Sequence, residues 1–197
     1  MGRGLISQVT SVVIVGSSGA GKTTLVNGLR TEELSNLLCI PRRYITRPKR
    51  DGDDLVENSH VSKEEFNKMV ASGNIWPYWQ RELDQGRIEQ YGFENVQSDK
   101  LKIYSANNAF LRDVNESLKT ALGESIVVVV ESDESKRTER LVDRSPDMKD
   151  SERSYRLSDS GQDVRSGNII INTTALLPEQ GQAALRRLVS QILNGEL

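Results

Sequence analysis

The chain has 197 residues, 36% of them hydrophobic and 27% charged, which excludes a disordered polypeptide. Its net charge of −2 excludes a globally basic surface for nucleic acid, so any positive site must be local. The single cysteine, Cys39, and the single histidine, His60, leave no disulfide framework and no cysteine- or histidine-based metal cluster. The apolar run at 12–15 is too short for a membrane helix, so we expect a cytoplasmic protein without a membrane segment.

Predicted strands and helices alternate along the chain. A β-branched run at 11–15 predicts a buried strand, and residues 23–29 predict a helix because Leu25 and Leu29 lie four positions apart. A capping box at 62–65, followed by apolar residues at helical spacing, predicts a helix that ends at Gly73. The later patterns predict strands at 101–104, 126–130 and 168–171, and helices at 107–122, 134–142 and 178–193.

This alternation favours an α/β fold with a parallel sheet covered by helices on both faces. Residues 40–99 interrupt the rhythm, because they are polar and turn-rich and contain both tryptophans. We interpret them as a lobe inserted into a single domain, whose core is formed by residues 9–39 and 100–197.

Residues 16–23 match the P-loop pattern G-x-x-x-x-G-K-[ST], directly after a predicted strand and directly before a predicted helix. In such a loop the backbone amides bind phosphate oxygens, the lysine reaches the β- and γ-phosphates, and the hydroxyl binds Mg²⁺. We therefore expect ATP and Mg²⁺, with Lys22 in the reaction and Thr23 on the metal. The expected nucleotide-binding residues of this segment are Gly16, Ser17, Ser18, Gly19, Ala20, Gly21, Lys22, Thr23 and Thr24.

The P-loop alone leaves several classes of enzyme open. A GTPase would carry an N-K-x-D motif, and this sequence has none. A motor ATPase would carry a carboxylate at the end of a hydrophobic strand, and Glu131 after the run at 127–130 fits that pattern. A kinase and an ATPase therefore both remain possible at this point.

Two basic clusters accompany the P-loop. The first follows the strand at 126–130 and suits phosphoryl transfer, which needs fixed positive groups near the transferred oxygens. Alternatively, these arginines form a solvent-exposed helix face and pair with neighbouring acidic residues. The second cluster, residues 42–50, predicts a pocket for a small phosphorylated substrate, with RNA binding as the alternative. The arginines of the first cluster are Arg137, Arg140, Arg144, Arg153 and Arg156.

Further motifs follow the P-loop in a fixed order. They are Thr-Arg-Pro-x-Arg at 46–50, His-Val-Ser-Lys-Glu-Glu-Phe at 60–66, Tyr-Gly at 91–92, Arg-Leu-x-x-Arg at 140–144, Arg-Leu at 156–157 and Ile-Ile-Ile-Asn at 169–172. This order resembles the guanylate kinase family over residues 10–193. The resemblance implies a P-loop NTPase fold with a five-stranded parallel core, a monophosphate-binding lobe at 40–99 and a lid at 143–156.

The resemblance also implies roles for individual residues. Arg47 and Arg50 would grip the phosphate of the acceptor, and Tyr91 would add a hydroxyl to the same phosphate. The lid residues Arg144 and Arg156 would close on the transferred phosphoryl group. The remaining implied residues are Arg140 and Asn172 for ATP, the latter beside adenine, and Arg43, Tyr44 and Tyr78 in the acceptor pocket.

Three elements that read guanine in guanylate kinases are absent. Arg43 stands in place of a serine, Tyr78-Trp79 lacks the glutamate of an E-W-A element, and residues 103–108 replace an acidic strand motif. The segment 43–47, with Glu57-Asn58 after it, is more similar to ribose 1,5-bisphosphate phosphokinases, although Asn107-Asn108 replaces their G-S-R.

These features predict an ATP-dependent kinase that transfers the γ-phosphoryl group to a phosphate of a small acceptor. The acceptor is a compound like ribose 1,5-bisphosphate or a nucleoside monophosphate. The alternatives are a guanylate kinase proper, a catalytically silent binding module, and a P-loop ATPase acting on RNA. We expect a small phosphorylated substrate as partner, no nucleic acid or membrane, and a monomer or homodimer.

Overall fold

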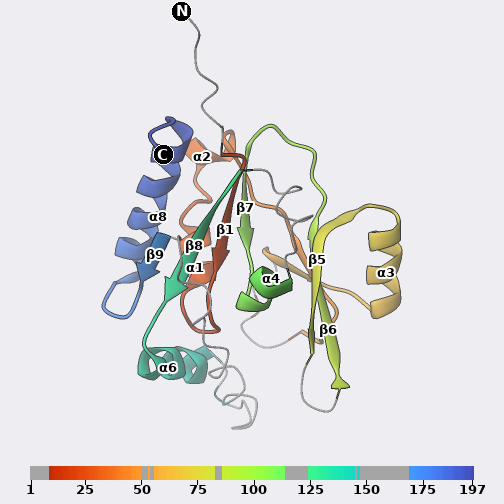
Figure 1. Ribbon diagram of the computed structural model, residues 1–197. Coiled ribbons are helices and arrows are strands. Elements are labelled where there is room, and N and C mark those ends of the chain that lie inside the picture. Colours follow the sequence, from red (N-terminus) through yellow and green to blue (C-terminus); the bar gives the residue numbers. More distant parts are fainter. Residues whose placement is uncertain are drawn as a thin grey trace, which may run out of the picture.

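A computed structural model describes residues 9–49, 53, 56–82, 86–113, 124–144, 146 and 169–197, without the side chains of residues 112, 113 and 144 (Figure 1). Its core is a five-stranded parallel sheet with the order β2-β7-β1-β8-β9. The central strand is buried along its whole length, as its continuous run of Val and Ile predicts. The strands are β1 (Ser11–Val15), β2 (Leu38–Cys39), β7 (Leu101–Ser105), β8 (Ser125–Glu131) and β9 (Ile169–Asn172).

The helix after the P-loop and the C-terminal helix cover one face of this sheet. The helix α1 after the P-loop packs closely against the C-terminal helix α8, since a Cβ added to Gly181 would lie 2.7 Å from the side chain of Leu25. One apolar cluster joins both helices to the sheet, and Figure 1 shows α1 and α8 on the same side of it. The helices outside the lobe are α1 (Lys22–Asn27), α2 (Glu32–Ser35), α4 (Asn108–Asp113), α6 (Glu134–Arg144) and α8 (Pro178–Leu193).

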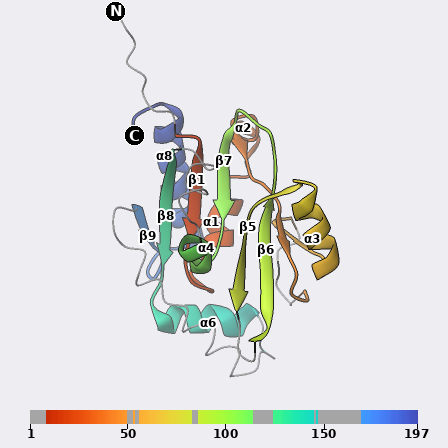
Figure 2. The same ribbon diagram turned by 45° about the vertical axis from the view of Figure 1, so that its right-hand side comes forward.

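The lobe contains a second sheet, with strand order β4-β3-β6-β5. β3 runs parallel to β4, whereas β6 is antiparallel to both β3 and β5. Both views show α3 on the outer side of this sheet, and α4 between β5 and the core (Figures 1 and 2). The elements of the lobe are β3 (Arg43–Ile45), β4 (Asn58–His60), α3 (Lys63–Ala71), β5 (Ile75–Glu82) and β6 (Ile88–Glu94).

The pairing register assigns the lobe residues to two faces. Tyr44 and Tyr78 both lie opposite Gly92, so these three residues share one face. A Cβ on Gly92 would lie 3.2 Å from the ring of Phe66 in α3, so this is the face that α3 covers. Ile45 and Trp79 lie opposite Tyr91 and point to the other face. That face packs on the core sheet through a second apolar cluster, which includes Val13, Val15, Phe93 and Phe110.

Most predicted elements of the core are confirmed, with shifts of one or two residues at their ends. The capping box is also confirmed, because Oγ of Ser62 accepts a hydrogen bond from the amide of Glu65 at the start of α3. The helix expected at 107–122 is present as α4, and residues 114–122 lie outside the described part. Most of the expected lid, 143–156, also lies outside it. Among the described residues, no helix has both the length and the apolar character needed to cross a membrane.

Candidate active site

Glycines shape the P-loop between β1 and α1. Gly16, Gly19 and Gly21 have φ values of 150°, 79° and 98°, which L side chains rarely adopt. A Cβ on Gly16 would lie 2.3 Å from the carbonyl oxygen of Val130, and one on Gly19 would lie 2.9 Å from that of Arg137. The loop therefore wraps tightly against the end of β8 and the start of α6, where only glycine fits.

Two side chains at the start of α1 lie where the P-loop pattern requires them. Lys22 Nζ donates hydrogen bonds to the carbonyl oxygens of Gly16 at 2.6 Å and Ser17 at 2.9 Å, so its ammonium group sits over the loop. The hydroxyl of Thr23 donates to Oε2 of Glu57 at 3.0 Å. Glu57 belongs to the lobe, directly before β4, so this hydrogen bond joins the lobe to the P-loop.

Glu57 is a site residue for which the sequence predicts no role. In the sequence it belongs only to the segment that is similar to ribose 1,5-bisphosphate phosphokinases. Its side chain is 3% exposed, and its Oε1 lies 3.8 Å from Nη2 of Arg43. The Thr23 hydroxyl and the Glu57 carboxylate are the hard oxygen ligands that Mg²⁺ prefers, and Mg²⁺ usually takes one or two protein ligands besides phosphates and water. The described residues hold no group of three or more His, Cys, Asp or Glu residues that suits a metal. These two oxygens therefore fit a metal bound together with nucleotide phosphates.

Arg43 is held by protein groups on several sides. Its Nε donates to Oδ1 of Asn58 at 2.9 Å, and its Nη1 donates to the carbonyl oxygen of Ser105 at 2.7 Å. Ser105 ends β7 of the core, so Arg43 ties the lobe sheet to the core sheet. We predicted Arg43 in the acceptor pocket, and the structure shows its guanidinium engaged at the junction between lobe and core.

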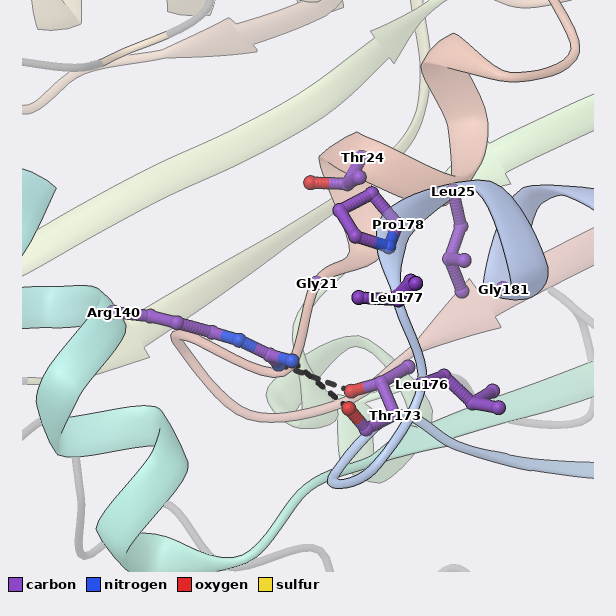
Figure 3. A pocket seen from close by; sticks show the side chains of 9 residues that line it. All are labelled: Gly21, Thr24, Leu25, Arg140, Thr173, Leu176, Leu177, Pro178 and Gly181. Atoms are coloured by element: carbon purple, nitrogen blue, oxygen red, sulfur yellow. Dashed lines mark hydrogen bonds between the residues drawn. The ribbon is translucent and has the colours of Figure 1, made fainter.

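A pocket of about 360 Å³, including space open to solvent, lies beside the P-loop. Arg140 of α6 enters it and donates from Nη1 to Oγ1 of Thr173 at 3.0 Å and from Nη2 to the carbonyl oxygen of Thr173 at 2.9 Å (Figure 3). Asn172 does not line the pocket, and its Oδ1 accepts from the amide of Thr174. A flat guanidinium opposite apolar side chains suits a planar base. The lining residues are Gly21, Thr24, Leu25, Arg140, Thr173, Leu176, Leu177, Pro178 and Gly181.

Arg47 lies two residues beyond β3, close enough to Tyr91 and Glu89 for their charges to act on it. Its Nη1 and Nη2 donate to the two carboxylate oxygens of Asp53 at 2.7 and 2.8 Å. Burial alone would lower the pKa of this guanidinium, but the hydrogen bonds and the charge of Asp53 outweigh burial, so the pKa is raised. Arg47 is therefore a fixed positive charge on the face of the lobe that turns toward the core.

Tyr91 lies close to this arginine, and its ring stacks on that of Trp79 with centroids 5.4 Å apart. Its hydroxyl donates to Oε2 of Glu89 at 2.5 Å. Burial, and secondarily the charge of Glu89, raises the pKa of Tyr91 to about 12. A phenol has one proton, and here Glu89 receives it, so Tyr91 in this arrangement offers an acceptor and not a donor. Its predicted hydrogen bond to the acceptor phosphate would require the contact with Glu89 to break.

The structure places two further predicted acceptor residues away from Arg47 and Tyr91. Tyr44 and Tyr78 lie on the face that α3 covers, opposite to Arg47 and Tyr91, because side chains alternate along a strand. We therefore do not group these two tyrosines with the acceptor site. The positions of Arg50, Arg153, Arg156 and the side chain of Arg144 lie outside the described residues.

Asn107 and Asn108 connect the lobe to the P-loop from the side of β7. Oδ1 of Asn107 accepts from Nε1 of Trp79 at 3.1 Å, and Nδ2 of Asn108 donates to Oγ of Ser17 at 3.4 Å. The resemblance had identified these positions only as departures from known motifs. Their contacts with Trp79 and Ser17 give them a structural reason to be polar.

A family model described as AAA domain matches residues 12–158. This chain belongs to that AAA domain family. Its fold is that of a guanylate kinase-like P-loop protein: a guanylate kinase from Anaplasma phagocytophilum superposes with a TM-score of 0.56 at 16% identity, over 96% of this chain and 87% of the other.

Two curated relatives match part of this AAA domain chain. A ribose 1,5-bisphosphate phosphokinase PhnN of Rhodopseudomonas palustris is 34% identical over 76 residues, which is 38% of each protein. A bifunctional ribose 1,5-bisphosphokinase-thymidine phosphorylase of Roseobacter denitrificans is 36% identical over 72 residues, 36% of this chain and 10% of the other. The chain thus spans well under two thirds of the curated relatives that it matches. These findings confirm the predicted fold class and the resemblance to guanylate kinase-like P-loop kinases.

Proposed function

We propose that this protein is an ATP-dependent kinase that transfers the γ-phosphoryl group of ATP to a phosphate group of a small acceptor. The observation that carries the proposal is the hydrogen bond of 3.0 Å between Thr23 of the P-loop and Glu57 of the lobe. It brings the phosphate-binding loop against the lobe on which Arg47 lies. A donor site and an anion-binding site that meet are what a phosphoryl transfer between two phosphates requires.

The donor half is assigned to the P-loop and the pocket beside it. Backbone amides at 16–23 bind the phosphates, Lys22 neutralises the β- and γ-phosphates, and the base lies between Arg140 and the segment 173–178. Thr23 and Glu57 would hold Mg²⁺, which when bound neutralises charge on the phosphate oxygens. Ser17, Ser18 and Thr24 remain proposed contacts of the nucleotide.

The acceptor half is assigned to Arg47 and Arg50, with Tyr91 beside them. The lid arginines Arg144 and Arg156 would approach the transferred phosphoryl group and exclude water. A phosphate oxygen of the acceptor is already an ionised nucleophile at neutral pH, so the transfer needs no protein base. This suits a chain whose single histidine, His60, contacts Arg47 and Asp53.

We propose ribose 1,5-bisphosphate as the leading acceptor, ahead of GMP. The guanidinium of Arg43 bonds to Asn58 and Ser105, where a guanylate kinase would offer a serine hydroxyl to guanine. A site without its hydrogen-bonding groups selects a base only weakly. The names of the two curated relatives favour the same acceptor. A guanylate kinase proper and a catalytically silent binding module remain the alternatives.

The proposal is tested by an assay that couples ATP consumption to absorbance, with ribose 1,5-bisphosphate, GMP, dGMP and other monophosphates as acceptors. We expect the largest stimulation with ribose 1,5-bisphosphate. Preferential stimulation by GMP would identify a guanylate kinase. Stimulation by no acceptor, together with tight binding of a protein or peptide, would identify a binding module.

A further inference from the structure

Among the described residues, hydrogen bonds reach the guanidinium of Arg47 along one of its two forks and leave the other without a partner. Nη1 and Nη2 donate to Asp53, and the second hydrogen of Nη1 is directed to the carbonyl oxygen of Pro48 at 3.0 Å. A guanidinium has five N–H donors, which form one fork at Nη1/Nη2 and a second at Nε/Nη2. Among the described residues, no hydrogen bond reaches Nε or the second hydrogen of Nη2. The second fork of Arg47 is therefore available to a ligand.

Asp53 is held firmly in this contact. Its side chain is 6% exposed and that of Arg47 is 10% exposed, so the pair is largely withdrawn from water. Two parallel N–H···O bonds between a guanidinium and a carboxylate fix the plane and the direction of both groups, whereas one bond would leave rotation free. Asp53 therefore determines which way the second fork points.

His60 of β4 contacts both members of the pair. Its Nδ1 donates to the backbone carbonyl oxygen of Arg47 at 2.9 Å, because a carbonyl oxygen can only accept. Its Nε2 lies 3.3 Å from Oδ2 of Asp53. One imidazole thus fixes the backbone at Arg47 and lies against the carboxylate that holds the side chain of Arg47. Arg47, Asp53 and His60 therefore each contact the other two.

We propose that Asp53 is a positioning residue for Arg47: it occupies the Nη1/Nη2 fork and so presents the Nε/Nη2 fork to the phosphate of the acceptor. This inference rests on the proposed function, since it concerns the same acceptor site. A phosphate takes two N–H donors from one fork in the same geometry as a carboxylate. Acceptor binding therefore leaves the contact between Asp53 and Arg47 in place.

A different role for Asp53 makes the opposite prediction. If the carboxylate merely occupied Arg47 until a phosphate displaced it, removal of its charge would strengthen acceptor binding. If it positions Arg47, removal of its charge weakens acceptor binding, because the amide of Asn offers only one acceptor oxygen to the two N–H groups. The two roles thus differ in the sign of one measured change.

The test is steady-state kinetics of Asp53→Asn and Asp53→Glu, with Asp99→Asn as a control that removes one carboxylate from an exposed loop. We expect Asp53→Asn to raise the KM for the acceptor about tenfold, equivalent to roughly 1.4 kcal/mol, with the KM for ATP within about twofold of the wild type. Asp53→Glu should recover part of the loss, and Asp99→Asn should leave both constants unchanged. A lower or unchanged acceptor KM in Asp53→Asn would overturn the proposal.

A binding experiment distinguishes a failure of this inference from a failure of the proposed function. Inorganic phosphate is titrated calorimetrically into protein saturated with Mg²⁺ and ADP, and Arg47→Ala identifies the signal that belongs to Arg47. If the wild type turns over no acceptor, the proposed function fails, yet weaker phosphate binding by Asp53→Asn still supports the positioning role. Equal or tighter phosphate binding by Asp53→Asn contradicts it. Circular dichroism shows that each variant is folded.

Discussion

Thr23 and Glu57 join the two halves of the site, because the Thr23 hydroxyl donates to the Glu57 carboxylate at 3.0 Å across the boundary between P-loop and lobe. Glu57 is buried, and its second carboxylate oxygen faces Arg43 at 3.8 Å. Arg43 in turn bonds to the end of β7. A single buried carboxylate therefore links the nucleotide side, the lobe and the core sheet.

Glu57→Gln should raise the Mg²⁺ concentration needed for half-maximal activity by about tenfold, because an amide oxygen binds Mg²⁺ less well than a carboxylate. The shape of the side chain is retained, and the glutamine oxygen can still accept from Thr23. Glu94→Gln, at an exposed position at the end of β6, serves as the control. An unchanged Mg²⁺ requirement in Glu57→Gln would remove Glu57 from the metal site.

Glu57→Ala should in addition destabilise the fold by about 1–3 kcal/mol, since it leaves the half-buried hydroxyl of Thr23 and the guanidinium of Arg43 without this partner. Urea unfolding followed by circular dichroism measures the change. Stability equal to that of the wild type would show that Glu57 is not needed to join the lobe to the core.

Gly16→Ala should destabilise the protein by about 3 kcal/mol or more, because a Cβ needs both an unfavourable φ and space that the backbone occupies. That Cβ would lie 2.3 Å from the carbonyl oxygen of Val130. Gly73→Ala is a matched control, since Gly73 also has a positive φ, 74°, but a Cβ there would meet nothing within 4 Å. Thermal unfolding of both variants separates the cost of the positive φ angle from the cost of the steric clash. A similar loss of stability in both variants would show that the clash at Gly16 costs little.

The core could be predicted well from the sequence because its signals are local. The β-branched runs of β1 and β8 and the glycine pattern of the P-loop each specify structure within a few residues. The same holds for the cap of α3 in the lobe. The lobe strands could not be predicted, because β3 and β4 are three residues long and gain stability only by pairing with their neighbours, β4 with β3 and β3 with β6.

The contacts of the site were less predictable than its motifs. Sequence order placed Arg47, Tyr91 and Tyr78 together, but alternation along β5 and β6 puts Tyr78 on the opposite face. The roles of Asp53 and Glu89 depend on contacts across turns and neighbouring strands that no local pattern encodes. Thr173 rather than Asn172 lines the pocket beside the P-loop, a difference of one residue that depends on where β9 ends.

Arg140→Lys should raise the KM for ATP about tenfold, equivalent to roughly 1.4 kcal/mol, and leave the KM for the acceptor nearly unchanged. An ammonium group cannot reproduce the two parallel contacts of Arg140 with Thr173, and it lacks the flat surface that suits a base. Arg187→Lys, on the exposed side of α8, is the control. A change in the acceptor KM alone would assign Arg140 to the other half of the site.

The stability of the protein should fall between pH 10 and pH 12, in part through Tyr104. Burial raises the pKa of Tyr104 to about 12, so in this interval the unfolded chain loses the proton while the folded chain keeps it. The contribution of Tyr104 to the free energy of unfolding is fully present below pH 10, and a pKa shift of this size corresponds to about 2–3 kcal/mol. Urea unfolding across this range should show a shallower decline in Tyr104→Phe. A decline as steep as that of the wild type would contradict the assignment.

The central claim is that the protein joins a phosphoryl group to a phosphate of the acceptor, and ³¹P NMR of the reaction products tests it most directly. With ribose 1,5-bisphosphate, Mg²⁺ and ATP, we predict a new pair of coupled diphosphate resonances on the sugar, in an amount equal to the ADP formed. Lys22→Ala, folded by circular dichroism, should form none. Release of inorganic phosphate in place of the diphosphate, or product formation that persists in Lys22→Ala, would contradict the account.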